Sequence, residues 1–176
     1  GIRLFASDSE SDLINIAEKA PGSQVYIRIL TEGSQTAEWP LSRKFGCQEE
    51  MAYDLLVLAK ELGLEPYGVS FHVGSQQKDI GVWDGALAKV FFLFESLYKE
   101  QNIKLQMINM GGGFPAQYQT KIHDLTTYAK EIKHYLDEDF LKEDSVWDEL
   151  PRIIIEPGRA LVGNIGVLVS EVILIA

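Results

Sequence analysis

The chain alternates short apolar runs with amphipathic helical patterns, and this alternation limits the folds that are open to it. Five apolar runs have the length and composition of strands, at residues 2–6, 24–30, 67–72, 105–110 and 152–156. Helical periodicity lies between several of them, at 49–64, 83–98 and 121–140. This order of elements is typical of repeated βα units on a parallel sheet. The sequence therefore predicts an α/β fold.

Each of the three predicted helices carries an apolar stripe at three- and four-residue spacing, which we expect to face the core. The stripes consist of Met51, Leu55, Leu58, Ala59 and Leu62, then Leu87, Val90, Phe91, Phe94 and Leu97, and finally Leu125, Tyr128, Ile132, Tyr135 and Leu136. The irregular stretch 31–40 is rich in turn-forming residues and is long enough to be a functional loop.

Five βα units leave two architectures open. One is a complete open sheet, and the other is part of a (β/α)8 barrel, which typically needs about 250 residues. The chain starts within one predicted strand and stops inside the apolar, β-branched run 166–176. We therefore expect part of a barrel, with residues 1–165 as the barrel segment and 166–176 as a strand leading into a further domain.

Composition argues against several classes of partner. With 26 acidic and 16 basic residues, the net charge of −10 disfavours nucleic acid and anionic membranes and suits a small cationic substrate. A single cysteine, Cys47, cannot form an internal disulfide, so a reducing, cytoplasmic setting is the default. The apolar stretch 167–176 is too short to span a bilayer and contains Ser170 and Glu171. We expect no nucleic-acid partner, no membrane partner and a cytoplasmic location.

The last predicted strand ends in Glu156-Pro157-Gly158-Arg159, a carboxylate and a guanidinium three positions apart. The isoleucine run before it predicts a strand buried on both faces, and α/β proteins place their chemistry where such strands end. A carboxylate in apolar surroundings suits a protonated ring nitrogen, and the planar fork of Arg159 suits a phosphate. The alternative is a structural ion pair between Glu156 and Arg159, although Pro157-Gly158 would turn the two groups apart.

Two other predicted strands also end in residues that can bind a ligand. Gly111, Gly112 and Gly113 expose backbone N–H groups that can cradle a phosphate, while the alternative is a simple tight turn. His72 is followed closely by Ser75, which puts an imidazole and a hydroxyl within one turn. A hydrogen-bonded core histidine is the alternative there. Together these strand ends predict a site for a phosphorylated, aromatic, nitrogen-containing ligand.

Arg28 lies inside the apolar run 24–30, and a cation on a buried strand needs an acidic partner or a ligand. A metal site is not predicted. The only histidines are His72, His123 and His134, the last two share a helical segment without ligand spacing, and Cys47 has no second cysteine to bind with.

Five short motifs, in their order along the chain, resemble the fold-type III pyridoxal-phosphate (PLP) decarboxylases of basic amino acids. The motifs are Arg28-Ile29, Lys44-Phe45-Gly46, Phe71-His72-Val73-Gly74-Ser75, Gly111-Gly112-Gly113-Phe114-Pro115 and Glu156-Pro157-Gly158-Arg159. Within this family the chain looks most like ornithine and bacterial lysine/ornithine decarboxylases, because Phe5-Ala6-Ser7-Asp8-Ser9 and Trp39-Pro40-Leu41 are similar to that branch. Diaminopimelate decarboxylases rank second, since they tend to differ before Lys44 and at Phe114-Pro115.

The resemblance implies a (β/α)8 TIM barrel of the alanine-racemase type, of which this chain carries roughly the last five βα units and the start of the following β domain. It implies pyridoxal 5'-phosphate as the cofactor. Glu156, paired with the ring nitrogen, and His72, stacked on the ring, would be the catalytic residues. The cofactor-binding set would be these two residues with Arg28, Ser75, Gly111, Gly112, Gly113, Pro157, Gly158 and Arg159, of which Ser75, the Gly113 amide and Arg159 would hold the phosphate.

The activity implied by the resemblance is decarboxylation of ornithine, or of lysine, to a diamine precursor of polyamines, in a homodimer that Lys44 would support. The family's lysine that binds PLP covalently has no counterpart in this chain, nor have the acid and cysteine supplied by the partner subunit. We therefore expect the chain to be inactive alone and to belong to a longer enzyme. Arginine or diaminopimelate decarboxylation and a non-catalytic regulatory homologue remain alternatives.

Overall fold

A computed structural model describes residues 1–32, 36–39, 44–143 and 145–175. Strands and helices alternate along the chain, as predicted. The elements are β1 (Leu4–Ser7), α1 (Glu10–Lys19), β2 (Gln24–Arg28), β3 (Ala37–Trp39), α2 (Glu49–Glu61), β4 (Glu65–Ser70), β5 (Ser75–Gln77), α3 (Gly81–Gln101), β6 (Met107–Asn109), α4 (Leu125–Phe140), β7 (Arg152–Ile154) and α5 (Gly158–Val162). The prediction of an α/β fold is confirmed.

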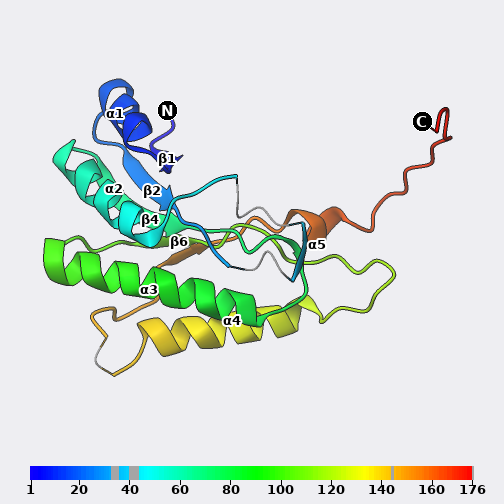
Figure 1. The fold of residues 1–176 in the computed structure, drawn as a ribbon. Helices are drawn as coiled ribbons and strands as arrows, with labels where there is room; N and C mark the ends of the chain where they lie inside the picture. Colours follow the sequence, from blue (N-terminus) through cyan, green and yellow to red (C-terminus); the bar gives the residue numbers. More distant parts are fainter. Residues whose placement is uncertain (33–35, 40–43, 144, 176) are drawn as a thin grey trace.

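One parallel sheet in the order β1-β2-β4-β6-β7 forms the centre of the fold, and α1 to α4 pack side by side on one face of it (Figure 1). Side chains alternate between the two faces, as the period of a strand requires. In β2, Val25 and Ile27 are fully buried in the core, whereas Tyr26 and Arg28 between and after them are only half-buried. The second face of the sheet is therefore the more open one.

The register aligns polar and functional positions across this open face. Arg28 pairs with Ser70 of β4, Ser70 pairs with Asn109 of β6, and Asn109 pairs with Ile154 of β7. A row of neighbouring residues thus runs across four strands, close to their carboxyl ends. The residues that come after these four in the sequence lie at the edge of the sheet where the strands end.

The predicted helix stripes are largely buried, including Leu55, Leu87, Phe94 and Tyr128, but two of their members are not. Met51 is 44% exposed because α2 buries Ala52 and Leu56, so that its inner face is rotated from the predicted one. Leu125 is 46% exposed because it is the first residue of α4, next to the N-cap. These two predictions were wrong.

The isoleucine run also differs from its prediction of a strand buried on both faces. Ile153 and Ile154 are half-buried, and Ile155 is 48% exposed. The cause is position: β7 is the edge strand of the five-stranded sheet, and the helices cover only one face. The strand ends at Ile154, so Glu156 lies two residues beyond it and is exposed rather than held in apolar surroundings.

The final residues, 166–175, form no strand and lead away from the body of the fold as an exposed segment (Figure 1). A strand needs a hydrogen-bonding partner, and the described residues offer this segment none. Its assignment to a strand of a further β domain stays a prediction. Within the described part of the chain, no helix has the length and apolar character required to cross a membrane.

The predicted loop 31–40 contains a strand that its turn-rich composition concealed. β3 pairs with β5 as a separate two-stranded antiparallel unit, with Ala37 opposite Gln77 and Trp39 opposite Ser75. Pro40 and Leu41, which belong to the motif after Trp39, lie outside the described residues.

Candidate functional site

The carboxyl ends of β2, β4, β6 and β7 meet on the side of the sheet where α5 lies (Figure 1). Backbone hydrogen bonds continue the parallel register past the strand ends. Phe71 N donates to Asn109 O (3.0 Å), and Glu156 N donates to Gly111 O (2.7 Å). His72, Gly111 and Glu156 consequently lie next to one another, although they are far apart in the sequence.

The glycine run allows this close approach. A Cβ atom added at Gly112 would lie 2.6 Å from the carbonyl oxygen of Glu156 and 3.1 Å from His72 Nε2. At Gly113, which has a φ of +103°, it would lie 2.6 Å from the carbonyl oxygen of Gly74. A tight turn alone would require only the positive φ. The contacts show that the run also makes room for two neighbouring strand ends.

His72 is half-buried, and its ring is oriented by a backbone hydrogen bond. Gly74 N donates to Nδ1 over 3.0 Å, so the proton of the neutral ring is on Nε2, the nitrogen that faces Gly112. Burial lowers the pKa of His72 below its ordinary value of 6.5, and the charge of Arg28 lowers it further, against an opposing effect of Glu156. The imidazole is therefore neutral at pH 7.

Glu156 is anchored by Asn109, a residue that the sequence analysis did not select. Asn109 Nδ2 donates to Glu156 Oε1 (3.0 Å), and its Oδ1 accepts from Gly111 N (2.9 Å). Arg159 lies in the first turn of α5 and is exposed, and among the described ion pairs none joins it to Glu156. The signal that could have identified Asn109 is an amide side chain inside an apolar strand directly before the glycine run.

Arg28 points its guanidinium over the ring of Phe45, 5.4 Å from the ring centroid, which is a cation–π distance. The adjacent Gly46 amide donates to Asp8 Oδ2 (2.8 Å) and so ties this loop to the start of α1. Among the described residues, no carboxylate forms an ion pair with Arg28. Arg28 is half-buried rather than buried and already contacts the Phe45 ring, so its need for an acidic partner or a ligand stays a prediction. Lys44, in the same loop, is exposed.

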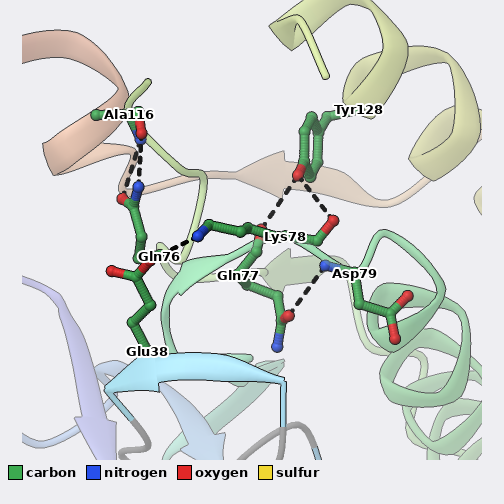
Figure 2. Close-up of polar contacts among 7 residues, drawn as sticks. All are labelled: Glu38, Gln76, Gln77, Lys78, Asp79, Ala116 and Tyr128. Atoms are coloured by element: carbon green, nitrogen blue, oxygen red, sulfur yellow. Dashed lines mark hydrogen bonds and ion pairs between the residues drawn. The ribbon is translucent and has the colours of Figure 1, made fainter. Parts of the chain in front are cut away.

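Contacts at Phe114 and Ala116 hold the loop that follows the glycine run, and Figure 2 shows the one at Ala116. The amide group of Gln76 bonds the Ala116 backbone twice, from Nε2 to the carbonyl oxygen (2.5 Å) and from the Ala116 N–H to Oε1 (3.0 Å). Phe114 packs against both Trp83 and Tyr128, with ring centroids 5.2 and 6.4 Å away. The loop is therefore fixed from both sides before any ligand binds. Ser75 begins β5 beside it and is half-buried.

The site as a whole brings together a neutral imidazole, an anchored carboxylate and a glycine run. The missing Cβ atoms of the run leave room for the backbone carbonyls of Phe71, Glu156 and Gly74, and the Gly111 N–H bonds Asn109 Oδ1. Pro157 is half-buried and Gly158 begins α5, so both shape the turn between Glu156 and Arg159. Over the described residues, no cluster of three or more His, Cys, Asp or Glu side chains could hold a metal ion.

The chain matches a known protein family. Residues 1–163 match the family described as "Pyridoxal-dependent decarboxylase, pyridoxal binding domain". The chain is 33% identical to the lysine/ornithine decarboxylase of Selenomonas ruminantium over 173 residues, 98% of this chain and 42% of the relative. It is 33% identical to ornithine decarboxylase of Mus musculus, with 36% of that protein covered, and 32% identical to antizyme inhibitor 2 of Xenopus laevis, with 38% covered.

Solved structures are similar as well. A crystal structure of lysine decarboxylase from Selenomonas ruminantium matches with a TM-score of 0.75 and 30% identity, over 88% of this chain and 38% of that one. The arginine decarboxylase of Paramecium bursaria Chlorella virus, bound to agmatine, matches with a TM-score of 0.76 and 26% identity, over 91% and 40%. A structure of SrLDC contains PLP and cadaverine and matches with a TM-score of 0.74 and 31% identity, over 90% and 37%.

The chain spans about two fifths of the length of the curated relatives it matches. Its parallel sheet with helices on one face is part of the (β/α)8 barrel of these proteins, and the cofactor of the family is PLP. From the matched family, the relatives and the shared fold, it follows that this chain belongs to the pyridoxal-dependent decarboxylases and carries their pyridoxal-binding domain.

Proposed function

We propose that the chain is the cofactor-binding part of a PLP-dependent decarboxylase that acts on a basic amino acid, ornithine first and lysine second. The observation that carries this proposal is the meeting of His72, the glycine run and Glu156 at one edge of the sheet. Since the chain covers about two fifths of its relatives, the activity is proposed for the complete protein.

In this proposal Glu156 binds the ring nitrogen and His72 lies against the ring face. A neutral imidazole suits that place, because a charged one would bring a second positive charge to a protonated ring. Arg28, held over Phe45, adds a cation on the same open face of the sheet. Bound PLP supplies the electron sink that accepts the electron pair left when carbon dioxide departs.

The phosphate would be bound by the other strand ends. The Gly113 amide and the Ser75 hydroxyl can donate hydrogen bonds to phosphate oxygens, and the Arg159 fork can bind two of them at once. Gly111 and Gly112 let the ends of β4 and β7 approach the run closely, and Pro157 and Gly158 direct the chain from Glu156 to Arg159. Preordering of the loop by Gln76 and Phe114 reduces the entropic cost of binding.

The test is carbon dioxide release from carboxyl-labelled ornithine, lysine, arginine and diaminopimelate by the full-length protein. We expect ornithine or lysine to be the preferred substrate, as the names of two similar relatives suggest. Glu156→Gln should reduce release by about a hundredfold or more, because the ring nitrogen loses its anionic partner. Glu149→Gln, the same change at an exposed site before β7, is the control. Equal activity of both variants would contradict the role of Glu156.

A regulatory homologue without catalysis is the second candidate, favoured by one observation. Antizyme inhibitor 2 is 32% identical to this chain, about as similar as the decarboxylases are. Intact mass after borohydride reduction in PLP separates the two. A cofactor adduct with carbon dioxide release supports the decarboxylase, whereas no release from any of the four amino acids supports the homologue.

We also propose that the complete protein forms a cytoplasmic homodimer and that its product is a diamine precursor of polyamines. The exposed Lys44, in the loop that Asp8 holds, lies where a second subunit could contact it. Light scattering of Lys44→Glu should show a shift toward monomer, and an unchanged mass would contradict the role of Lys44.

A further inference from the structure

Asn109, at the end of β6, contacts two segments of the candidate cofactor site. Its Oδ1 accepts from the Gly111 N–H at 2.9 Å, and its Nδ2 donates to Glu156 Oε1 at 3.0 Å. The residue is only 5% exposed. One buried amide thus connects the glycine run after β6 to the carboxylate after β7.

These two partners fix the orientation of the amide. A backbone N–H can only donate and an ionised carboxylate can only accept, so Asn109 must present its oxygen to Gly111 and its nitrogen to Glu156. An aspartate of the same shape could still accept from Gly111. It would, however, place a second carboxylate about 3 Å from Glu156, where both cannot stay ionised without strong repulsion.

We infer that Asn109 is a positioning residue, which holds the Glu156 carboxylate at a fixed place by anchoring it to the Gly111 backbone. The inference rests on the proposed function, in which Glu156 binds the ring nitrogen of PLP. A free, exposed glutamate side chain populates several rotamers, and fixing it beforehand removes that entropic cost from cofactor binding. The same amide keeps the carboxylate at a constant distance from the glycine run that would bind the phosphate.

Three variants of the full-length protein test the inference. Asn109→Asp keeps the acceptor for Gly111 and removes the donor to Glu156. The double variant Asn109→Asp/Glu156→Gln exchanges acid and amide, which restores the hydrogen bond with reversed polarity. Gln119→Glu is the control, because it makes the same amide-to-acid change on an exposed loop.

The first measurement is the urea midpoint of the apo-protein as a function of pH. In Asn109→Asp the two carboxylates must share a proton in the folded state, so stability should fall as the pH rises from about 5 to about 8. The wild type, the control and the double variant should lack this additional slope. An Asn109→Asp profile that parallels the wild type would overturn the contact between the two side chains.

The second measurement is the dissociation constant of PLP at pH 7. Asn109→Asp and the double variant should both bind PLP about tenfold or more weakly, since neither presents the anchored Glu156 carboxylate to the ring nitrogen. The double variant also lacks the Glu156 carboxylate, so the test of Asn109 itself is the single variant: wild-type PLP affinity in Asn109→Asp would overturn the inference. If the wild type bound no PLP, the proposed function would fail, and the pH profile would still report separately on the contact.

Discussion

Replacing Gly112 by alanine tests whether crowding at the strand ends organises the site. The added Cβ would lie 2.6 Å from the carbonyl oxygen of Glu156 and 3.1 Å from His72 Nε2. Gly112 has no positive φ, so alanine meets no backbone strain there and the effect is one of space alone. The first contact involves backbone, which cannot rotate away as a flexible side chain can.

The size of the effect follows from that distance. Ordinary contact begins at 3.4 Å, so the segment after β7 must move by about 0.8 Å relative to the glycine run. Overpacking of this kind typically costs about 1–3 kcal/mol of unfolding free energy. A displacement of about 1 Å at a site can reduce catalysis about a hundredfold, and here it would fall on Glu156.

Urea unfolding of the full-length apo-protein measures the loss of stability, and titration with PLP reports whether the displaced Glu156 still binds the cofactor. Gly85→Ala is the matched control, because Gly85 lies exposed in α3 with nothing within 4 Å of an added Cβ. That variant should gain about 0.5–1 kcal/mol from the greater helix propensity of alanine. If Gly112→Ala kept both the wild-type unfolding midpoint and the wild-type PLP affinity, the argument from crowding would be refuted.

Three further predictions concern titratable groups. In an NMR pH titration His72 should protonate below its ordinary pKa of 6.5, because burial and then the charge of Arg28 lower its pKa. The neutral ring therefore contributes stability above pH 6.5, and this stability is lost as the pH falls through the lowered pKa. A midpoint above 6.5 would contradict the assignment. Burial, and after it the charge of Asp8, raises the pKa of Cys47 to about 11. At pH 8 the thiol of the native protein should therefore react with a disulfide reagent about a hundredfold more slowly than the thiol of the urea-unfolded protein. Equal rates would count against this pKa. Asp124 caps α4 by accepting a hydrogen bond from Thr127 N (2.7 Å), which lowers the pKa of Asp124. Asp124→Ala should lower the unfolding midpoint at pH 7, and the difference from the wild type should vanish as acid protonates Asp124. A difference that stays constant with pH would point to another cause.

Local patterns were enough to locate the strands and the groups that meet at their ends. All five predicted strands exist, and each end lies within two residues of the prediction, because apolar runs and turn-forming residues act locally. The same applies to His72, the glycine run and Glu156, whose position after strands marked them as site candidates. The prediction failed where burial depends on neighbours, as at Ile155 on an edge strand and Met51 on a rotated helix face.

Contacts between distant segments could not be predicted in this way. Three contacts join residues about 40 or more positions apart, and no local pattern marks them. They are the pairing of β3 with β5, the Gln76–Ala116 hydrogen bonds and the Asn109–Glu156 hydrogen bond. The exposure of Glu156 likewise depends on which faces of the sheet are covered.

The sequence by itself determined the family, the cofactor and the order of the βα units, because these depend on short motifs and on periodicity that is written into consecutive residues. Only the tertiary structure decided that Gly112 lies against the backbone of Glu156 and that Asn109 anchors the Glu156 carboxylate. The physical reason is that parallel strands pair with partners far along the chain. Their ends meet only after the sheet has formed, so distance and orientation at the site are properties of the fold.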